Sequence, residues 1–323
     1  MTTLVTGGAG YIGAHVVRML LPRGDVLVVD DLSSGRADRV DHARLVRLDL
    51  AAPEASAALA RLMVEHEVSE VVHLAGRKLA AESVARPTWY FSQNVGGLCS
   101  VLAAMEQAGV RRLVFSSSAA VYGSPADLAP IAEDAPCAPI NPYGQSKLVG
   151  EWLCGNAERA WGLSWAALRY FNVAGAGWPD LGDPTVQNLV SIALHRLRSG
   201  LPPEVFGTDY GTPDGTCVRD YVHVSDLAEA HLAVLRHLAR GSGGDPAPVL
   251  NVGTGAGSSV LEVLAAIGAV TGQDVVPLPA PRRAGDPAAV TADVRRIREV
   301  VGWEAKRDLA EIVRSAWEAT PGR

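Results

Sequence analysis

Leu4-Val5-Thr6-Gly7-Gly8-Ala9-Gly10-Tyr11-Ile12-Gly13 is the stretch near the start of the chain that decides the fold. Residues 2–6 predict a strand, and an apolar helical stretch follows the last glycine. Glycines three residues apart let the backbone turn tightly and approach a pyrophosphate, while the helix N-terminus offers oriented N–H groups. An ordinary tight strand-to-helix turn uses the same residue types. The stretch alone leaves both interpretations open.

Two acids follow the second predicted strand, 26–30. Asp30 and Asp31 stand about 20 residues after the glycines, where an acid accepts hydrogen bonds from the adenosine ribose hydroxyls and repels a 2′-phosphate. This position favours NAD over NADP. Two acids in a turn that caps the next segment would give the same sequence. Asp49-Leu50 follows the third strand and would flank the adenine, although Asp49 is equally typical of a helix cap.

The first half of the sequence alternates short apolar runs with helical stretches. Strands are predicted near 2–6, 26–30, 44–48, 70–75, 111–117 and 166–170, and helices at 53–66, at 95–109 and after Asn141-Pro142. This alternation is typical of βαβ units and predicts a parallel sheet with helices on both faces.

After about residue 176, Gly and Pro become frequent, which predicts a loop-rich second lobe with a surface loop at Gly241-Ser-Gly-Gly. The expected fold class is α/β: a doubly wound parallel sheet (Rossmann) with a smaller C-terminal α/β lobe. The first domain would cover 1–175, with a return segment near 220–255, and the second mainly 176–323.

Composition argues against several classes of protein. With 323 residues, 48% of them hydrophobic, the chain can bury a large core. Its 29 Lys and Arg against 35 Asp and Glu give a net charge of −6, the wrong sign for a nucleic-acid partner. The four cysteines are widely spaced, so we expect reduced thiols and no metal site. No apolar run suggests a membrane span, and the early strand leaves no room for a signal segment. We expect a cytoplasmic protein.

A second group of residues carries candidate chemistry. Tyr143 and Lys147 lie four residues apart on one face of the helix after Asn141-Pro142, where an ammonium beside a phenol favours the phenolate. Upstream, residues 116–118 place three serine hydroxyls at the carboxyl end of a strand, the edge where parallel sheets bind ligands. A surface Tyr and Lys, and serines that only satisfy a turn, are the plainer alternatives. The order and spacing of all these features favour one active site.

These stretches resemble a known family. The matching segments are Leu4 to Gly13, His73-Leu-Ala-Gly-Arg-Lys78, Ala81-Glu-Ser83, Phe115-Ser-Ser-Ser-Ala-Ala-Val-Tyr-Gly123, Asn141-Pro-Tyr-Gly-Gln-Ser-Lys147, Arg169-Tyr-Phe-Asn172, Val218-Arg-Asp-Tyr-Val-His-Val224 and Pro281-Arg-Arg-Ala-Gly-Asp286. Over nearly its whole length the chain resembles the extended short-chain dehydrogenases/reductases, and within that group it is similar to the UDP-glucose 4-epimerases.

The resemblance implies a role for each matching position. Tyr143 matches the catalytic base, Lys147 the residue that holds the nicotinamide ribose and lowers the tyrosine pKa, and Ser118 the hydroxyl that bonds to the sugar oxygen. The other positions expected to bind NAD are Gly7, Gly10, Tyr11, Ile12, Gly13, Asp30, Asp31, Leu32, Ser33, Asp49, Leu50, Leu74, Ala75, Gly76, Lys78, Asn94 and Phe171. Those expected around the UDP-sugar are Asn172, Asn188, Leu189, Phe206, Arg219, Arg283, Asp286 and Val290. For Arg219 the alternative is an ion pair with Asp220 or Asp226.

The resemblance also implies a reaction and an assembly. The reaction is reversible C4 epimerisation of UDP-galactose and UDP-glucose through a 4-keto intermediate, with NAD tightly bound. Tyr143 would take the proton of the 4-hydroxyl while a hydride leaves C4, and the hydride would return to the other face. The implied assembly is a homodimer formed through helices near 88–108 and 142–160.

Some positions depart from the family pattern. Leu74 stands where Phe is common, and Arg77 and Leu79-Ala80 replace an apolar and small run beside Lys78. We expect these to adjust cofactor contacts without removing them. Val290 falls where family members carry either a bulky Tyr or a small residue. This predicts that UDP-N-acetylhexosamines are also accepted, unless Val290 merely packs the loop.

Two other kinds of function compete with this interpretation. Nucleotide-sugar 4,6-dehydratases, decarboxylases and UDP-uronate epimerases share the scaffold. The dehydratases carry an Asp-Glu pair where Ala119-Ala120 follows Ser118 here. A non-catalytic NAD-sensing module would be of another class, and such modules tend to lose the Tyr or the Lys.

Overall fold

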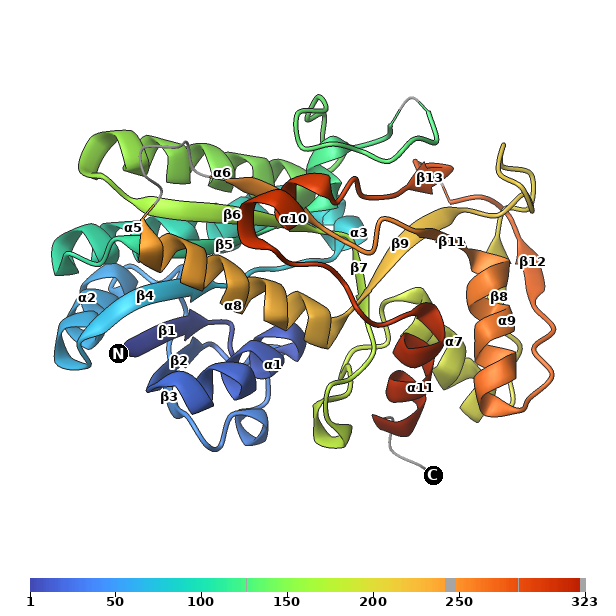
Figure 1. Cartoon of the computed structure of the whole chain (residues 1–323), viewed down its shortest axis with the longest axis horizontal. Helices are drawn as coiled ribbons and strands as arrows, with labels where there is room; N and C mark the ends of the chain where they lie inside the picture. Colours follow the sequence, from blue (N-terminus) through green and yellow to red (C-terminus); the bar gives the residue numbers. More distant parts are fainter. Residues whose placement is uncertain (126, 242–247, 284, 320–323) are drawn as a thin grey trace.

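A seven-stranded parallel sheet forms the larger part of the molecule (Figure 1). The structure, a computed structural model, describes residues 1–125, 127–241, 248–283 and 285–319. The strand order is β10-β6-β5-β4-β1-β2-β3, and every neighbouring pair is parallel. The strands are β1 (Thr2–Thr6), β2 (Val26–Asp30), β3 (Arg44–Arg47), β4 (Val68–His73), β5 (Arg112–Ser118), β6 (Ser164–Tyr170) and β10 (Val249–Val252). The predicted doubly wound sheet is confirmed.

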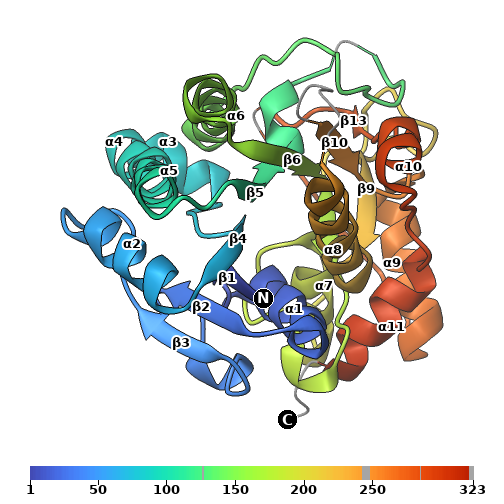
Figure 2. The same ribbon diagram turned by 60° about the vertical axis from the view of Figure 1, so that its left-hand side comes forward.

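Helices cover both faces of this sheet (Figure 2). Side chains alternate along β1, so that Val5 packs into the core under one layer of helices and Leu4 into the core under the other. Both faces are therefore apolar, which explains why β1 and β2 are buried along their whole length. One layer contains α1 (Tyr11–Leu20), α8 (Val224–Arg240) and α10 (Arg295–Val301); the other contains α2 (Ala55–Glu65), α5 (Gly97–Ala108) and α6 (Pro142–Trp161).

The position of β1 in the sheet determines where a ligand can bind. The chain runs outward from β1 through β2 to β3, then crosses back to β4 on the other side of β1. At such a reversal the loops after the two central strands diverge and leave a crevice at the carboxyl ends. Here those loops follow β1 and β4.

A later part of the sequence returns to the large sheet. Helix α8 lies in the same layer as α1, and β10 adds the edge strand beside β6. Residues 242–247, which include most of the predicted glycine-rich surface loop, lie outside the described residues. The division at residue 176 into an NAD domain and a sugar domain stays a prediction.

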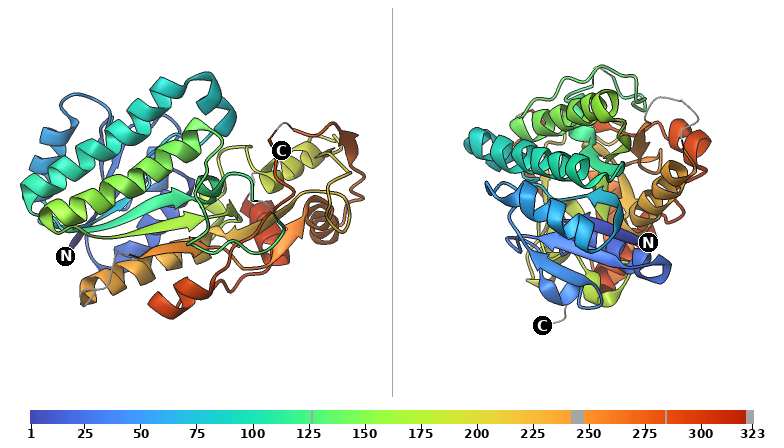
Figure 3. Two further views of the ribbon diagram at one scale, coloured as in Figure 1. Left: turned by 90° about the horizontal axis from the view of Figure 1, so that it is seen from above. Right: turned by 90° about the vertical axis from the view of Figure 1, so that its left-hand side faces the viewer.

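The remaining strands form two small sheets at one end of the molecule (Figure 3). Their apolar core is separate from those of the large sheet and includes Val190, Tyr221 and Ile267. This part holds more helix than its Gly and Pro content suggested, because Asn188 and Ser259 begin two of its helices with capping boxes. Its elements are β7 (Asn172–Ala174), β8 (Glu204–Phe206), β9 (Val218–His223), β11 (Gly257–Ser259), β12 (Leu278–Ala280), β13 (Ala289–Val290), α7 (Leu189–Arg198), α9 (Val260–Thr271) and α11 (Leu309–Ala319).

The predicted helix at 88–108 is interrupted. It consists of α4 (Pro87–Phe91), a π-helix (Ser92–Gly96) and α5, and α3 (Ala80–Ala85) precedes it. Short π segments often mark functional positions, and this one contains Asn94. Short 3₁₀ helices lie at Leu21–Arg23, Ala37–Arg39, Ala119–Tyr122 and Pro179–Leu181. Within the described ranges, no helix is both long and apolar enough to cross a membrane.

Candidate functional site

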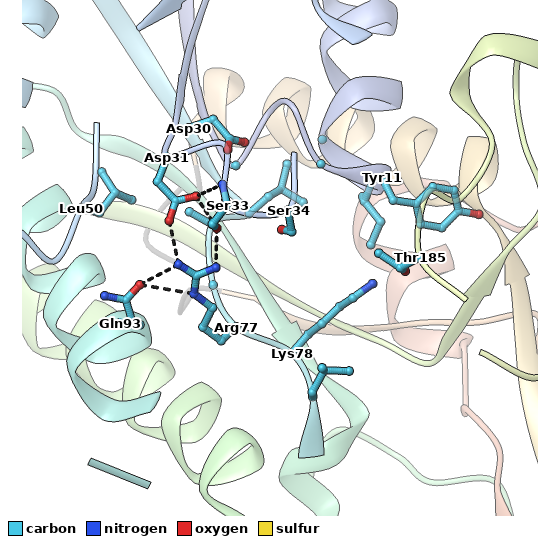
Figure 4. A pocket seen from close by; sticks show the side chains of 18 of the residues that line it. Tyr11, Asp30, Asp31, Ser33, Ser34, Leu50, Arg77, Lys78, Gln93 and Thr185 are labelled. Atoms are coloured by element: carbon cyan, nitrogen blue, oxygen red, sulfur yellow. Dashed lines mark hydrogen bonds and ion pairs between the residues drawn. The ribbon is translucent and has the colours of Figure 1, made fainter. Parts of the chain in front are cut away.

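A cavity opens beyond the carboxyl ends of β1, β2, β3 and β4 (Figure 4). It gathers residues from several segments far apart in the sequence. Of the predicted NAD positions, its walls include Gly7, Gly10, Tyr11, Ile12, Gly13, Asp30, Asp31, Ser33, Asp49, Leu50, Leu74, Ala75, Gly76, Lys78, Tyr143 and Lys147. Three others, Leu32, Asn94 and Phe171, are not among the residues that line this cavity.

The glycine loop has almost no room for side chains. Gly7 has a φ of 71°, and a Cβ placed on it would lie 2.6 Å from the backbone nitrogen of Ala75. A Cβ on Gly13 would lie 2.1 Å from the carbonyl oxygen of Gly7. Helix α1 begins at Tyr11, so its first N–H groups lie directly beside this narrow turn. A close backbone approach next to a helix N-terminus fits a dinucleotide pyrophosphate.

The two acids after β2 have different surroundings. Asp30 is buried, and its carboxylate oxygens accept hydrogen bonds from the backbone nitrogens of Ala9 (3.0 Å) and Leu32 (2.8 Å). Burial raises the pKa of Asp30, and these bonds only partly offset that rise. Asp31 accepts from the backbone nitrogen of Ser33 at 2.9 Å. Burial alone would raise its pKa as well, but the Ser33 hydrogen bonds and the charge of Arg77 lower it overall. Asp30 thus connects the loops after β1 and β2, while Asp31 is an ionised residue of the cavity wall that pairs with Arg77.

The helix-cap interpretation of Asp49 is wrong, because Glu54 occupies the N-cap position of α2 and Asp49 lies in the turn before it. Its carboxylate accepts a hydrogen bond from the backbone nitrogen of Ala51 at 2.9 Å, in the turn ahead of α2. Asp49 also lines the cavity, next to Leu50. The side chain shapes the turn, and the turn forms one wall.

Tyr143 lies in the first turn of α6. Asn141 caps this helix by accepting a hydrogen bond from the backbone nitrogen of Gly144 at 2.9 Å, and Pro142 occupies the first helical position. Burial raises the pKa of Tyr143, and a hydrogen bond with the Ser118 side chain acts in the opposite direction. Ser118 is the last residue of β5, so the strand end and the helix start bring the two hydroxyls together.

Lys147 is buried, with 6% of its surface exposed. Its Nζ lies 5.4 Å from the centre of the Phe115 ring. None of the described residues forms an ion pair with it. Burial lowers the pKa of Lys147 from 10.5 to about 8.

Asn94 connects this lysine to the loop after β4. Its side-chain nitrogen donates to the Ser146 hydroxyl (2.9 Å) and to the Arg77 carbonyl (3.0 Å), while its oxygen accepts from the Arg77 backbone nitrogen (2.7 Å). Ser146 directly precedes Lys147. Asn94 therefore positions two walls of the cavity without lining it.

A buried polar network lies behind the serine cluster. Glu151 accepts hydrogen bonds from Arg169 at 2.9 Å and 2.6 Å and from the Ser117 hydroxyl, and both charged side chains are 6% exposed. Arg169 also donates to the Tyr122 hydroxyl at 3.0 Å. The network links α6 to the ends of β5 and β6, next to Ser118.

Comparisons with known proteins agree with this geometry. A model of the NAD dependent epimerase/dehydratase family matches residues 3–253. The chain belongs to this family. A curated relative, the UDP-glucose 4-epimerase of Azospirillum brasilense, is 47% identical over 98% of the chain and 91% of its own length. The resemblance seen in the sequence is confirmed.

Solved structures of the family superimpose closely. The UDP-glucose 4-epimerase of Stenotrophomonas maltophila, solved with bound NAD and formylated UDP-arabinopyranose, has a TM-score of 0.92 and 39% identity, covering 99% of this chain and 97% of its own. The UDP-Glc/GlcNAc 4-epimerase of Campylobacter jejuni has a TM-score of 0.85 and 36% identity, with 98% of both chains covered.

In this member of the epimerase/dehydratase family, the positions predicted for the UDP-sugar lie mainly in the smaller part. Five of them form one cluster. Arg219 pairs with Asp286, the backbone nitrogen of Asp286 donates to the carbonyl of Arg283 at 3.3 Å, and the Arg283 guanidinium lies 3.8 Å from the centre of the Phe206 ring. Val290 of β13 stands opposite Arg219 of β9.

The other three predicted positions lie apart from this cluster. Asn172 stands opposite Tyr221 in the pairing of β7 with β9. Asn188 caps α7, where Leu189 begins the helix, and its side chain donates to Asp183 at 2.9 Å.

The suggested alternative partners of Arg219 have other roles. Asp220 is fully buried and accepts hydrogen bonds from the backbone nitrogens of Thr254 and Gly255 at 2.8 and 3.0 Å. Asp226 pairs with Arg307. The alternative that Arg219 pairs with either acid is wrong, because the partner is Asp286, which lies much further along the sequence.

Several wall residues were missed from the sequence. They are Val29, Ser34, Leu48, Arg77, Leu79, Glu82, Gln93, Tyr170, Pro184, Thr185 and Gln187. Ser34 and Leu48 could have been predicted from the sequence, since each adjoins a predicted position. Pro184, Thr185 and Gln187 come from a loop with no recognisable local pattern. Arg77 had been noted only as a departure from the family.

Proposed function

We propose that this chain catalyses the reversible C4 epimerisation of UDP-galactose and UDP-glucose with NAD as its bound cofactor. The observation that supports this best is the meeting of Ser118, Tyr143 and Lys147 beside a cavity whose glycine loop excludes side chains. UDP-glucose 4-epimerase relatives that match nearly the whole chain support the same function.

Each protein group has a distinct task in the proposed reaction. Tyr143 accepts the proton of the sugar 4-hydroxyl and later returns it, while Ser118 donates a hydrogen bond to the same oxygen. Bound NAD supplies the acceptor, and afterwards the donor, of the hydride at C4. Lys147 holds the nicotinamide ribose and keeps a positive charge near the phenol. Atoms and electrons balance, because the proton and hydride removed from the sugar are both returned.

The pKa of Tyr143 determines what the site needs in order to work near neutral pH. Burial raises that pKa above 10, and the hydrogen bond from Ser118 opposes the rise. A positive charge nearby favours the phenolate. The proposal therefore requires the ammonium of Lys147 and the positive nicotinamide ring to act together in lowering the tyrosine pKa.

Each of the two parts of the chain would bind one of the two ligands. Residues 1–175, with the return segment near 220–255, would bind NAD, and residues 176–323 would mainly bind the UDP-sugar. The Arg219, Arg283 and Phe206 cluster supports this, since guanidinium groups bind a diphosphate through several hydrogen bonds. Arg219 would exchange its bond to Asp286 for one to the phosphate.

The sugar pocket would also admit an N-acetyl group at C2. Val290 is half-buried in β13, directly opposite Arg219, and a valine leaves more room there than a tyrosine. A Val290→Tyr variant should keep turnover of UDP-galactose and lose most turnover of UDP-N-acetylgalactosamine. Unchanged N-acetyl turnover in that variant would show that Val290 only packs the loop.

The assembly would be a homodimer in the cytoplasm. Helix α6 presents Trp152 with 60% of its surface exposed, on a helix predicted to form the contact with α5. A large exposed aromatic side chain is a frequent centre of protein interfaces. Multi-angle light scattering should give a dimer mass for the native protein and a monomer mass for Trp152→Glu; a native monomer contradicts the assembly.

The central experiment follows the sugar directly. Purified protein is incubated with UDP-galactose and, separately, with UDP-N-acetylgalactosamine, without added NAD, and the C4 epimers are followed by proton NMR. Conversion of both supports the epimerase and the open pocket; conversion of UDP-galactose alone supports only the first. Conversion of neither, even with NAD supplied, contradicts the proposal and favours a dehydratase, a decarboxylase or a non-catalytic module.

A further inference from the structure

The ring of Phe115 lies beside the ammonium of Lys147, a residue of the cavity wall. Phe115 belongs to β5, the strand that ends at Ser118, and it is 2% exposed. The Lys147 Nζ lies 5.4 Å from the centre of this ring. A cation within about 6 Å of an aromatic ring is attracted by the negative potential of the ring face. In the part of the chain that the structure describes, this ammonium has neither a hydrogen bond nor an ion pair.

Three neighbours hold the Phe115 ring in one place. A Cβ on Gly150 of α6 would lie 2.4 Å from the ring carbon Cζ, so the ring occupies the space that a side chain at Gly150 would need. The same Cβ would lie 3.2 Å from Leu98 of α5. On β4, His73 stands opposite Phe115, and the two rings are nearly parallel with their centres 6.0 Å apart. The ring therefore has little freedom to turn away from Lys147.

His73 supports the ring without adding a charge. Its Nδ1 lies 2.8 Å from the hydroxyl of Thr6 on the neighbouring strand β1. Burial and, to a lesser extent, the charge of Lys147 lower the pKa of His73 to about 3. The imidazole is therefore neutral at pH 7 and does not repel the ammonium.

Other titratable groups around this ammonium belong to the proposed reaction or are engaged elsewhere. On α6 itself, Tyr143 is the proposed base and Glu151 pairs with an arginine. On α3 and α4, which pack beside α6, Glu82 accepts a hydrogen bond from the Tyr90 hydroxyl at 2.9 Å. Burial opposes the charged form of the lysine and lowers its pKa to about 8. The Phe115 ring is the neighbour that favours the charged form.

We propose that Phe115 is a positioning residue of the proposed reaction, whose ring face holds the Lys147 ammonium charged and in place at the cavity wall. The inference rests on the proposed function, because the charge matters for catalysis only if Tyr143 is the base. A positive charge nearby lowers the pKa of a phenol. Phe115 acts on Tyr143 through the lysine, and it is not among the residues that line the cavity.

The sequence makes a direct test possible, because Lys78, Lys147 and Lys306 are the lysines of the chain. Nucleotide-free protein labelled with ¹³C at the lysine Cε is titrated with base by NMR, and Lys147→Met assigns the Lys147 signal. We expect Phe115→Leu to lower the midpoint of that signal by about 0.5 to 1 pH unit, because the attraction to the ring face is lost. The signals of Lys78 and Lys306 should keep their midpoints, since both side chains are exposed.

Leu98→Ala is the matched control for packing. Leu98 is buried in the same apolar core as Phe115 and lies beside the same glycine. Both substitutions remove as many carbon atoms, but only Phe115→Leu removes an aromatic face. The midpoint of Leu98→Ala should stay within about 0.2 pH units of native. If Phe115→Leu does not fold, a ring-fluorinated phenylalanine at position 115 replaces it; that ring keeps its shape, has a less negative face, and should also lower the midpoint.

A second measurement links the contact to the reaction. The proposed reaction needs a charged Lys147 beside an ionised Tyr143, so activity reaches its alkaline limit where the lysine releases its proton. In the NAD-bound protein, Phe115→Leu should move this limit in the kcat profile for UDP-galactose to lower pH, by about 0.5 to 1 pH unit. KM should stay within about twofold, because the ring does not line the cavity. Leu98→Ala should keep the native pH profile.

The outcomes separate this inference from the proposed function. If the native protein converts UDP-galactose but Phe115→Leu keeps or raises the native Lys147 midpoint, the inference alone is refuted. It is also refuted if Leu98→Ala lowers the midpoint as much as Phe115→Leu, since packing then accounts for the change. A protein whose midpoint falls as expected but which converts no UDP-sugar refutes the proposed function, while the contact between ring and ammonium stands.

Discussion

Replacing Lys147 with methionine should make the nucleotide-free protein more stable and should leave the NAD-bound protein nearly inactive. Burial lowers the pKa of this lysine from 10.5 to about 8, and none of the described residues forms an ion pair with it. One pKa unit corresponds to about 1.4 kcal/mol, so holding the charge costs about 3 kcal/mol. Methionine keeps most of the length of the lysine side chain and removes the charge. We expect the free energy of unfolding at pH 7 to rise by about 1 to 3 kcal/mol.

The pH dependence identifies the lysine as the cause. Below pH 8 the lysine is charged in both the folded and the unfolded chain, and the full cost applies. Between pH 8 and 10.5 the folded chain has released this proton while the unfolded chain still binds it, so the stability of the native protein increases with pH. The advantage of Lys147→Met should therefore shrink from pH 8 upward and disappear near 10.5.

Urea denaturation of the nucleotide-free proteins at pH 7, 9 and 10.5 measures this difference. Lys78→Met is the matched control, since Lys78 lines the same cavity but is exposed, and its stability should stay within about 0.5 kcal/mol of native at every pH. A Lys147→Met protein that is less stable than native at pH 7 would refute the reasoning. So would a stability gain that does not change with pH.

Three further predictions concern the same region. Tyr143→Phe should lower kcat for UDP-galactose by about 10² to 10⁴, because the proton acceptor is lost while the ring still packs. Glu151→Gln should lower the free energy of unfolding in urea by about 3 to 5 kcal/mol, since it leaves the buried Arg169 without its counter-ion. Asn94→Ala should weaken NAD binding by about tenfold in a fluorescence titration, because the backbone of Arg77 loses two hydrogen bonds.

Each of these three has a result that contradicts it. Full activity of the phenylalanine variant excludes Tyr143 as the base. If Glu151→Gln lowers the free energy of unfolding by less than about 1 kcal/mol, the pair of Glu151 and Arg169 is not shielded from water. Asn156 is exposed on the far part of α6 and serves as the control for Asn94. Equal NAD affinity of both alanine variants means that Asn94 does not position the cavity wall.

The sequence was most informative where one short segment determines its own conformation. The glycine loop and the start of the helix after Asn141-Pro142 depend on residues within a few positions, and the structure forms both as expected. The alternation of strands and helices likewise predicts the large sheet, because burial on two faces leaves an apolar run on central strands such as β1 and β2.

The sequence was least informative where a side chain has several possible partners. Arg77 contacts Asp31, 46 residues earlier, and Arg219 contacts Asp286, 67 residues later. Local spacing suggested Asp220 or Asp226 for Arg219, and both proved to be engaged elsewhere. Charge alone cannot choose among acids that the fold brings equally near. The π-helix at Ser92–Gly96 was missed for a related reason, since the hydrogen bonds of Asn94 reach the loop after β4 and helix α6, both outside its own helix.

Lys147 and Glu151 show that the fold, rather than residue spacing along a helix, determines which ion pair forms. The two residues stand at i and i+4 on α6, the spacing that favours an ion pair along a helix. Glu151 instead pairs with Arg169, whose guanidinium reaches it from β6 with two hydrogen bonds, and the Ser117 hydroxyl adds a third. The carboxylate is thereby committed to the ends of β5 and β6, where it supports Ser118. The ammonium of Lys147 consequently has no carboxylate partner among the described residues, and burial lowers its pKa to about 8.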